Sequence, residues 1–282
     1  MDFSGTGVGL NGKLTWITGT PPPDAGRRTG DDVQFTIATL VRDGAQYDEM
    51  LRSFQNGGFI QGCEYLALDN RGGNRFEAYG GIRLILEQAL GRHVIVCHQD
   101  VRLIKDGYSD LLARLGELDL LDPLWAIVGN AGATDQGIAK RISDPHGEDQ
   151  HSGELPQRTL SLDENFLVIK RSAMIAPSAD LAGFHLYGTD LCLQARMRGH
   201  SAYVIDYHLR HLGRGTIGRD YYLCLEALED KYARVLKPGM IKTTCLAPTI
   251  TASPWRLALA RLGRLRKKLK KLRNERLVKT AG

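Results

Sequence analysis

No apolar run in this 282-residue sequence approaches the roughly 20 residues needed to span a bilayer, which excludes a membrane-spanning helix. The five cysteines are scattered and never form CxxC or another zinc-finger spacing, which excludes a finger-type metal site. The first twelve residues lack the basic and apolar segments of a signal peptide, and we expect none. These absences favour reduced thiols in a cytoplasmic protein.

The body of the chain also lacks the excess of basic residues that a nucleic-acid-binding surface needs. Residues 251–282 contain eleven Lys or Arg and one acid, a net charge of +10. The other 250 residues carry 26 basic and 31 acidic residues, so the overall charge of +5 conceals an acidic body and a basic tail. We therefore expect no nucleic-acid partner and a single basic docking segment.

The order of the predicted elements is that of an α/β protein. Residues 1–31, rich in Gly and Pro, predict an irregular N-terminal arm with one short strand at 14–18. Residues 32–250 predict one domain, and residues 251–282 a helical tail. Strands are expected at 34–41, 64–68, 94–97 and 125–128, with helices at 47–55, 76–90 and 108–118 between them. This alternation predicts a Rossmann-like mixed sheet, mostly parallel, with helices on both faces.

The second half of the domain is less regular in sequence. Residues 135–157 are polar, and we expect a loop whose two histidines, His146 and His151, are solvated and bind no metal. Further strands are expected at 160–170 and 201–206. Further helices are expected at 188–199, with Thr189 as the N-cap, and at 220–235.

The segment GVGLNGK, residues 7–13, matches two phosphate-loop patterns, GxGxxG and GxxxxGK. Both patterns need a buried strand before them and a helix after them. Only six residues precede this segment, and Leu14 follows it where Ser or Thr is required. We interpret the match as fortuitous.

Polar residues follow three of the predicted strands. They are Arg42, Asp69, Asn70, His98, Gln99 and Asp100. Ligands of parallel sheets bind outside the carboxyl ends of the strands, so we expect these residues to converge on one crevice. The alternative is that they are ordinary strand-terminating turns.

Three residues in particular suggest a metal-assisted reaction. Asp100, a carboxylate at a strand end, is suited to Mg²⁺ or Mn²⁺. Asp190, near the start of a predicted helix, is kept ionised by the helix dipole and is suited either to general-base work or to capping. His211 follows a strand in a Gly-rich turn and can complete a metal shell.

Four short segments carry a family resemblance. They are HQDV (98–101), LDENFLVIKR (162–171), FHLYGTDLCLQARMRG (184–199) and RHLGRG (210–215). In this order, within residues 34–215, they resemble the family 2 glycosyltransferases, and within them the subgroup of the streptomycin-biosynthesis glycosyltransferase-like domain. The resemblance implies a GT-A fold, a sugar donor linked to UDP, dTDP or GDP, and Mn²⁺ or Mg²⁺.

The resemblance also implies roles for single residues at the metal and the nucleotide. Asp100 matches the metal-binding acid of the family's DxD motif, whereas His98 stands at that motif's first acid. Asp69 matches an acid that contacts the base or ribose. His211 matches a histidine near the diphosphate and the metal.

Other positions match residues near the sugar and the acceptor. Asp190 matches the acid that deprotonates the acceptor hydroxyl in inverting members, and Asp163 and Glu164 match an acidic pair close to the sugar. Residues 79–81 stand where relatives carry an Asn, and we expect Arg83 to take over a phosphate contact. The predicted set is Asp190 for catalysis, Asp100 and His211 for metal, and Arg42, Asp69, Asn70, Arg83, His98, Gln99, Asp163 and Glu164 for the donor.

The tail predicts an amphipathic helix. Its leucines at 262, 265, 269 and 272 are spaced 3, 4 and 3 apart between basic residues, with Trp255 near the start. We expect residues 253–277 to bind an anionic membrane surface, on the inner face of the cell membrane. The alternatives are a helix that packs on the body and a short coiled-coil seam.

The sequence therefore predicts a metal-dependent, inverting glycosyltransferase. Its acceptor is expected to be a saccharide or lipid-linked saccharide in surface polysaccharide or glycoconjugate synthesis. One alternative is a non-catalytic protein of the same fold that docks through its basic tail. A second is a nucleotidyltransferase, disfavoured because the loop after the first domain strand (41–49, VRDGAQYDE) is not the Gly-rich basic loop such an enzyme needs.

Overall fold

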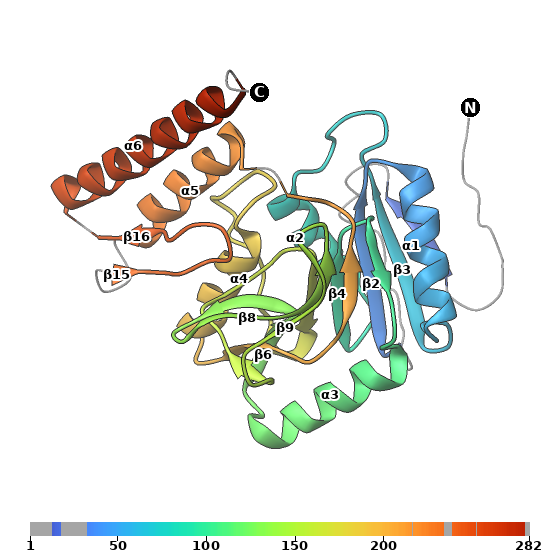
Figure 1. Ribbon diagram of the computed structural model, residues 1–282. Coiled ribbons are helices and arrows are strands. Elements are labelled where there is room, and N and C mark those ends of the chain that lie inside the picture. The colour runs from blue at the N-terminus through green and yellow to red at the C-terminus, as the bar shows by residue number, and fades with distance from the viewer. Residues whose placement is uncertain (1–12, 18–32, 216, 234–238, 252, 280–282) are drawn as a thin grey trace.

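A computed structural model describes residues 13–17, 33–215, 217–233, 239–251 and 253–279 (Figure 1). They form a mixed α/β protein with helices on both faces of a Rossmann-like sheet, which confirms the predicted fold class. The GVGLNGK motif, apart from Lys13, lies outside the described residues, as does most of the predicted N-terminal arm.

The main sheet has eight strands. Their order is β1 (Lys13–Ile17), β3 (Cys63–Asp69), β2 (Phe35–Val41), β4 (His93–Cys97), β12 (Phe166–Lys170), β6 (Trp125–Gly129), β13 (Ser201–Val204) and β10 (Gln157–Arg158). The pairs β1–β3, β3–β2, β2–β4 and β6–β13 are parallel, while β12 runs antiparallel to β4 and β6, and β10 to β13. The sheet is mixed and mostly parallel, as predicted.

Side chains that alternate along the strands bury both faces of this sheet. In β4, Val94 and Val96 join one apolar cluster, and Ile95 and Cys97 join the other. The helices of the first cluster are α2 (Ala78–Gln88), α4 (Tyr187–Met197) and α5 (Arg219–Tyr232). Those of the second are α1 (Gly44–Asn56) and α3 (Tyr108–Leu121).

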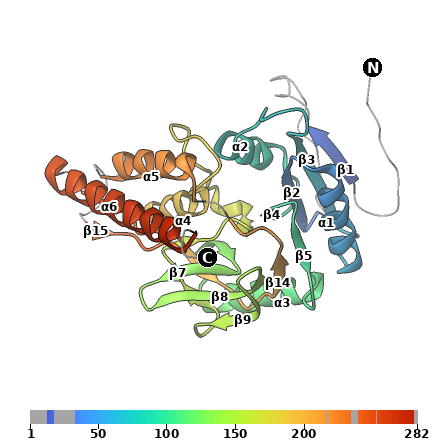
Figure 2. The ribbon, with the colours of Figure 1, turned by 45° about the horizontal axis from the view of Figure 1, so that its top comes forward.

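A second sheet lies beside the first (Figure 2). Its strand order is β11 (Ser161–Leu162), β7 (Ala131–Thr134), β8 (Gly137–Asp144), β14 (Leu209–His211) and β5 (Val101–Leu103), and β9 (Gly147–Ser152) pairs with β8. The expectation of a loop at 135–157 is wrong, because most of that segment is the β8–β9 hairpin. The sequence of the hairpin lacks the alternating apolar pattern that predicts strands, because only two apolar side chains of β8, Ala139 and Ile142, are buried.

Two further expectations from the second half need correction. The predicted strand at 160–170 is two strands in different sheets, β11 and β12, because the chain turns at residues 163–165. Thr189 does not cap α4, since the helix already begins at Tyr187. The preceding Leu186 is in the left-handed region, with a φ of 66°, and has no side-chain cap.

The C-terminal part is a short β-pair, β15 (Gly239–Met240) with β16 (Thr249–Ile250), followed by helix α6 (Pro254–Lys279). Helix α6 lies along α5 (Figure 1), so the tail does pack on the body. The short helix η1 (Arg171–Ala173) follows β12. Within the described residues, no helix is both long and apolar enough to cross a bilayer.

Candidate metal and donor site

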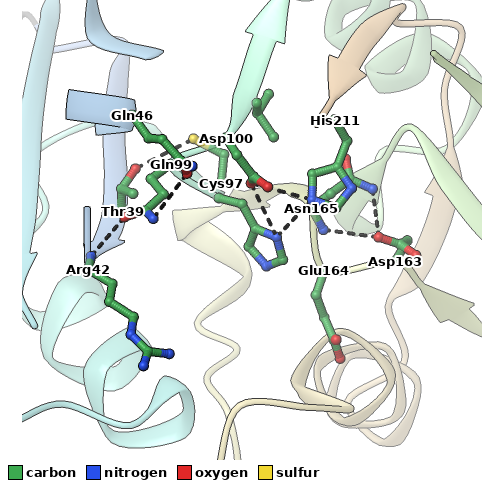
Figure 3. Close-up of polar contacts among 12 residues, drawn as sticks. Thr39, Arg42, Gln46, Cys97, Gln99, Asp100, Asp163, Glu164, Asn165 and His211 are labelled. Atoms are coloured by element: carbon green, nitrogen blue, oxygen red, sulfur yellow. Dashed lines mark hydrogen bonds and ion pairs between the residues drawn. The ribbon is translucent and has the colours of Figure 1, made fainter. Parts of the chain in front are cut away.

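The carboxyl ends of β3, β2 and β4 meet at one edge of the main sheet, as the sequence predicted. The Gln99 side-chain oxygen accepts hydrogen bonds from the backbone N–H groups of Arg42 and Asp43, at 2.7 and 2.9 Å (Figure 3). The backbone N–H of Asn70 donates to the Val41 carbonyl at 2.8 Å. Side-chain and backbone bonds therefore fix the three strand ends relative to one another.

Asp69 and Asn70 are both buried at the end of β3, but they have different partners. The Asn70 side-chain amide donates to the Phe76 carbonyl at 2.8 Å and accepts from the Phe76 backbone N–H at 2.9 Å. Asp69 accepts from Arg71 Nε at 2.8 Å, and that hydrogen bond lowers the pKa of Asp69. The Arg71 guanidinium lies 4.1 Å from the centre of the Trp16 ring on β1. Asn70 therefore supports the turn, whereas Asp69 lies at the sheet edge with both oxygens facing the arginines Arg71 and Arg75.

His98, Asp100 and His211 form a compact cluster. His211 Nε2 lies 3.4 Å from Asp100 Oδ1 and 3.3 Å from His98 Nδ1. One ligand atom from each of the three residues lies within 4.8 Å of the others. Strands β5 and β14 bring them together, because β5 follows Asp100 directly and pairs antiparallel with β14, placing Val101 opposite His211.

Asp100 and His211 stabilise each other's charge, whereas His211 disfavours a charge on His98. Burial works to lower the pKa of His211, but the hydrogen bond and charge of Asp100 outweigh it and raise that pKa. The same contact with His211 holds the pKa of Asp100 below its ordinary value although burial opposes this. Burial and the nearby His211 lower the pKa of His98.

The donor set fits a divalent cation, and the backbone leaves room beside it. Two imidazole nitrogens and a carboxylate oxygen are ligands that Mn²⁺ accepts. A Cβ atom on Gly213 would stand 2.7 Å from Asp100 Oδ2 and 3.3 Å from His211 Nε2. Glycine at this position therefore keeps the approach to the cluster open.

Asp190 and Arg83 meet at Ser178, in contacts separate from the strand ends. The Asp190 carboxylate is fully buried and accepts from the Ser178 N–H and hydroxyl, both at 2.7 Å, and from the Tyr232 hydroxyl at 2.6 Å. Arg83 donates to the Ser178 carbonyl at 2.8 Å. Both side chains hold the segment around Ser178 in place, and the roles that the resemblance implies for them stay predictions.

Asp163 and Glu164 lie in the turn between β11 and β12. Asp163 accepts from the Asn165 amide at 2.6 Å and from Thr244 at 3.3 Å. Glu164 Oε1 accepts from the Gly188 N–H at 3.4 Å, at the start of α4. Burial, and then the charge of Asp163, raise the pKa of Glu164 to about 8. Glu164 is thus a carboxyl group that takes up a proton easily near neutral pH.

Sequence reasoning missed Tyr187, whose hydroxyl lies 3.2 Å from His98 Nε2 and 3.1 Å from the Glu164 carbonyl oxygen. No periodicity distinguishes this tyrosine from a core residue, since it is also buried.

The five cysteines are free thiols, and only Cys245 among them is exposed. None of these cysteines belongs to the cluster of His98, Asp100 and His211.

No family model matches the sequence. Among solved structures, A197 from STIV is similar with a TM-score of 0.39 and 12% identity, over 64% of this chain and 85% of that one. Two structures of S. aureus TarS each give a TM-score of 0.45 and 11% identity over 73% of this chain. They are matched over 41% of one TarS chain and 67% of the other, which comprises residues 1–349. Likenesses of this size assign no activity.

A sequence relative is much closer. A Fuscovulum blasticum protein described as "ATP synthase subunits region ORF 6" is 41% identical over 217 residues, which are 74% of this chain and 87% of the relative. The chain therefore belongs to the same family as this Fuscovulum blasticum protein.

Proposed function

We propose that the protein is a metal-dependent glycosyltransferase of family 2 with a GT-A fold. It would transfer a sugar from a nucleotide-diphosphate donor to a hydroxyl of a saccharide or lipid-linked saccharide. The supporting observation is the cluster that joins HQDV to RHLGRG. Its histidines, 113 residues apart in the sequence, lie in contact beside three converging strand ends.

The strand ends supply the donor subsite in this proposal. Asp69 lies at the end of β3 for the base or ribose, and Arg42 and Gln99 lie where β2 and β4 end. Asp100 and His211 would hold the divalent cation next to the diphosphate. When bound, the cation neutralises charge on the departing nucleoside diphosphate.

Proton removal from the acceptor needs a carboxylate near the start of α4. The resemblance assigns this role to Asp190, which in the structure has donors on both oxygens, so acting as a base requires exchange of the Ser178 or Tyr232 bond. Glu164, whose carboxyl group contacts the first turn of α4, is the second carboxylate there. Direct displacement with either base inverts the anomeric carbon.

Two variants decide between these carboxylates. Asp190→Asn and Glu164→Gln are compared for transfer rate and for free energy of unfolding. Loss of about 100-fold or more in rate, with the fold retained, identifies the base. A variant that keeps the full rate cannot have lost the base.

The first test of the proposed function is thermal unfolding with UDP, dTDP and GDP, each with and without Mn²⁺. Stabilisation by one nucleotide that depends on Mn²⁺ supports the proposal and identifies the donor's base. Asp100→Asn should abolish the metal-dependent part. If none of the three nucleotides stabilises the wild-type chain, the transferase proposal fails in favour of a non-catalytic binding protein.

The contacts and exposed residues of helix α6 favour the proposal that the protein binds a membrane surface. It contacts α5 through basic side chains: Arg264 binds Glu229 with two hydrogen bonds, at 2.6 and 2.8 Å, and Arg261 binds Asp230 at 2.9 Å. The apolar side chains Trp255 and Leu259 are 82% and 66% exposed. Helix α6 thus docks by its arginines and leaves the apolar side chains of Trp255 and Leu259 largely in solvent.

The exposed apolar residues form a stripe that a basic residue interrupts. At 100° per residue, positions 255, 259, 262, 265 and 269 fall within roughly 120° of arc, and Arg266 falls within the same arc. All five apolar residues are at least half exposed, and further lysines and arginines flank them. This combination fits an anionic lipid surface, which would also present a lipid-linked acceptor. Flotation with anionic liposomes should carry the full chain and leave behind a chain ending at residue 250; equal flotation of both would contradict the membrane partner.

A further inference from the structure

His98 lies between the metal cluster and the start of helix α4. Its Nδ1 atom is 3.3 Å from His211 Nε2 and 4.0 Å from Asp100 Oδ1. Its Nε2 atom is 3.2 Å from the Tyr187 hydroxyl. One ring nitrogen therefore faces the cluster while the other faces the tyrosine.

The tyrosine determines which nitrogen of His98 carries the hydrogen. The Tyr187 hydroxyl lies 3.1 Å from the Glu164 carbonyl oxygen, which can only accept, so the tyrosine donates its proton there. The hydroxyl must then accept from His98, and Nε2 is the atom that carries the hydrogen. The lone pair of Nδ1 is left directed at Asp100 and His211.

The three facing atoms are spaced as ligands of one ion. Asp100 Oδ1, His211 Nε2 and His98 Nδ1 form a triangle with sides of 3.3, 3.4 and 4.0 Å. The point in their plane that is equidistant from them lies about 2.1 Å from each, an ordinary metal–nitrogen or metal–oxygen bond length. The three distances therefore allow all three atoms to bind one cation.

We propose that His98 is a third ligand of the cation, bound through Nδ1, and that Tyr187 positions its ring. The inference rests on the proposed function only for the presence of a divalent cation at this cluster. A site of two histidines and one carboxylate favours a transition-metal ion such as Mn²⁺ over Mg²⁺, which prefers oxygen ligands. The tyrosine acts as the outer hydrogen-bond partner that metal-binding histidines usually have.

The direct test uses the unaltered full-length chain loaded with Mn²⁺. Pulsed EPR detects nitrogen nuclei bound to the ion, and two histidine couplings are expected. Mn²⁺ should also bind more tightly than Mg²⁺ in calorimetric titration. A single nitrogen coupling, or equal affinity for the two ions, overturns the inference.

Variants then identify the second nitrogen. His98→Ala should remove one coupling and weaken Mn²⁺ binding. Tyr187→Phe should keep both couplings while weakening binding about 10-fold, as loss of an outer partner does. The control is His151→Ala, which replaces an exposed histidine on β9. It should change neither the number of nitrogen couplings nor the affinity for Mn²⁺. Unchanged couplings in His98→Ala would overturn the assignment.

The outcomes separate this inference from the proposed function. Two nitrogen couplings without a Mn²⁺-dependent effect of UDP, dTDP or GDP would support the three-ligand site and contradict the transferase. Nucleotide binding that requires Mn²⁺ but shows one coupling would support the transferase and overturn the role of His98.

Discussion

His93, at the start of β4, is a histidine that the fold buries in its neutral form. Its ring stacks on Trp125 with 5.6 Å between centroids, and Nδ1 lies 3.1 Å from the Gln34 amide nitrogen. Burial lowers the pKa of His93 from 6.5 to about 4. The unfolded chain therefore binds a proton below pH 6.5 that the folded chain does not bind until the pH approaches 4.

Stability should consequently fall as the pH is lowered through this window. The contribution of His93 is fully present above pH 6.5, and about 2 kcal/mol of it is lost between pH 7 and pH 5. We expect urea unfolding at pH 7 and pH 5 to show that His93→Gln loses less free energy of unfolding between these pH values than the wild type does. The difference should be about 2 kcal/mol. The exposed His151, changed to Gln, is the control and should leave the pH dependence as it is in the wild type. Identical pH dependence in wild type and His93→Gln would contradict the argument.

Asp190 contributes to the stability of the fold independently of any catalytic role. Its carboxylate accepts three hydrogen bonds while fully buried, so Asp190→Asn turns an N–H₂ group toward at least one donor. Leaving buried donors unsatisfied should lower the free energy of unfolding by about 1–3 kcal/mol. Asp180→Asn, which breaks an exposed ion pair with Lys231, should cost less than about 1 kcal/mol in the same chemical denaturation. Equal costs for the two variants would show that the Asp190 bonds add little.

At the scale of secondary-structure elements, the sequence predicted the apolar strands of the main sheet that are buried on both faces. It missed the half-polar strands of the second sheet, and also β7, which is buried but consists of small residues. Strands β2, β3, β4 and β6 were found because nearly all their residues are buried, so their sequences are nearly continuous apolar runs. The β8–β9 hairpin was missed because polar pairs such as Lys140 with Gln150 join its strands. Strand pairs of that kind look like loops in a single sequence.

Helices α5 and α6 are joined by a buried charge. Glu229 has no exposed side-chain surface and receives both terminal nitrogens of Arg264. Arg264→Ala would leave that carboxylate without its main partner, and removing one member of a buried pair typically costs 3–5 kcal/mol. Because Arg261 Nε lies within 3.9 Å of the same carboxylate, we expect the lower end, about 3 kcal/mol.

The measurement is urea unfolding together with limited proteolysis by trypsin. In Arg264→Ala, the tail should be cleaved faster than in the wild type, while the body remains resistant. Arg264→Lys keeps the positive charge but not the two parallel hydrogen bonds to Glu229. Its tail should be cleaved at a rate between those of the wild type and Arg264→Ala. Proteolysis of Arg264→Ala at the wild-type rate would show that α6 does not depend on this contact.

At the scale of the whole molecule, the sequence predicted which strand ends converge but not how each side chain is used there. Asp100 and His211 could be paired in advance because both follow strands and match family segments. The turn of Asn70 toward Phe76 and the contact of Arg83 with Ser178 depend on tertiary neighbours that no local pattern encodes. The link from Tyr187 to His98 joins positions 89 residues apart, and only the folded chain reveals it.

The whole molecule is also an asymmetric charge distribution, with a tail of +10 on a body of −5. If α6 binds an anionic membrane, attraction by its basic residues should weaken as salt screens it, since the Debye length falls from about 10 Å at 0.1 M to about 3 Å at 1 M. The apolar stripe adds a contribution that salt does not screen. Flotation with anionic vesicles should therefore fall with salt without vanishing, and neutral vesicles should bind weakly.

A variant of the stripe separates these two contributions. Trp255→Gln with Leu259→Gln changes two exposed side chains and leaves the Arg264–Glu229 contact intact, so the free energy of unfolding should stay within about 0.5 kcal/mol of wild type. Its flotation should fall at every salt concentration and should vanish at high salt, where only the apolar contribution remains. The matched control is Leu120→Gln, an 89% exposed leucine on α3, which should float like the wild type. If the stripe variant floats as well as the control, the apolar residues of α6 do not contact the membrane and binding is electrostatic alone.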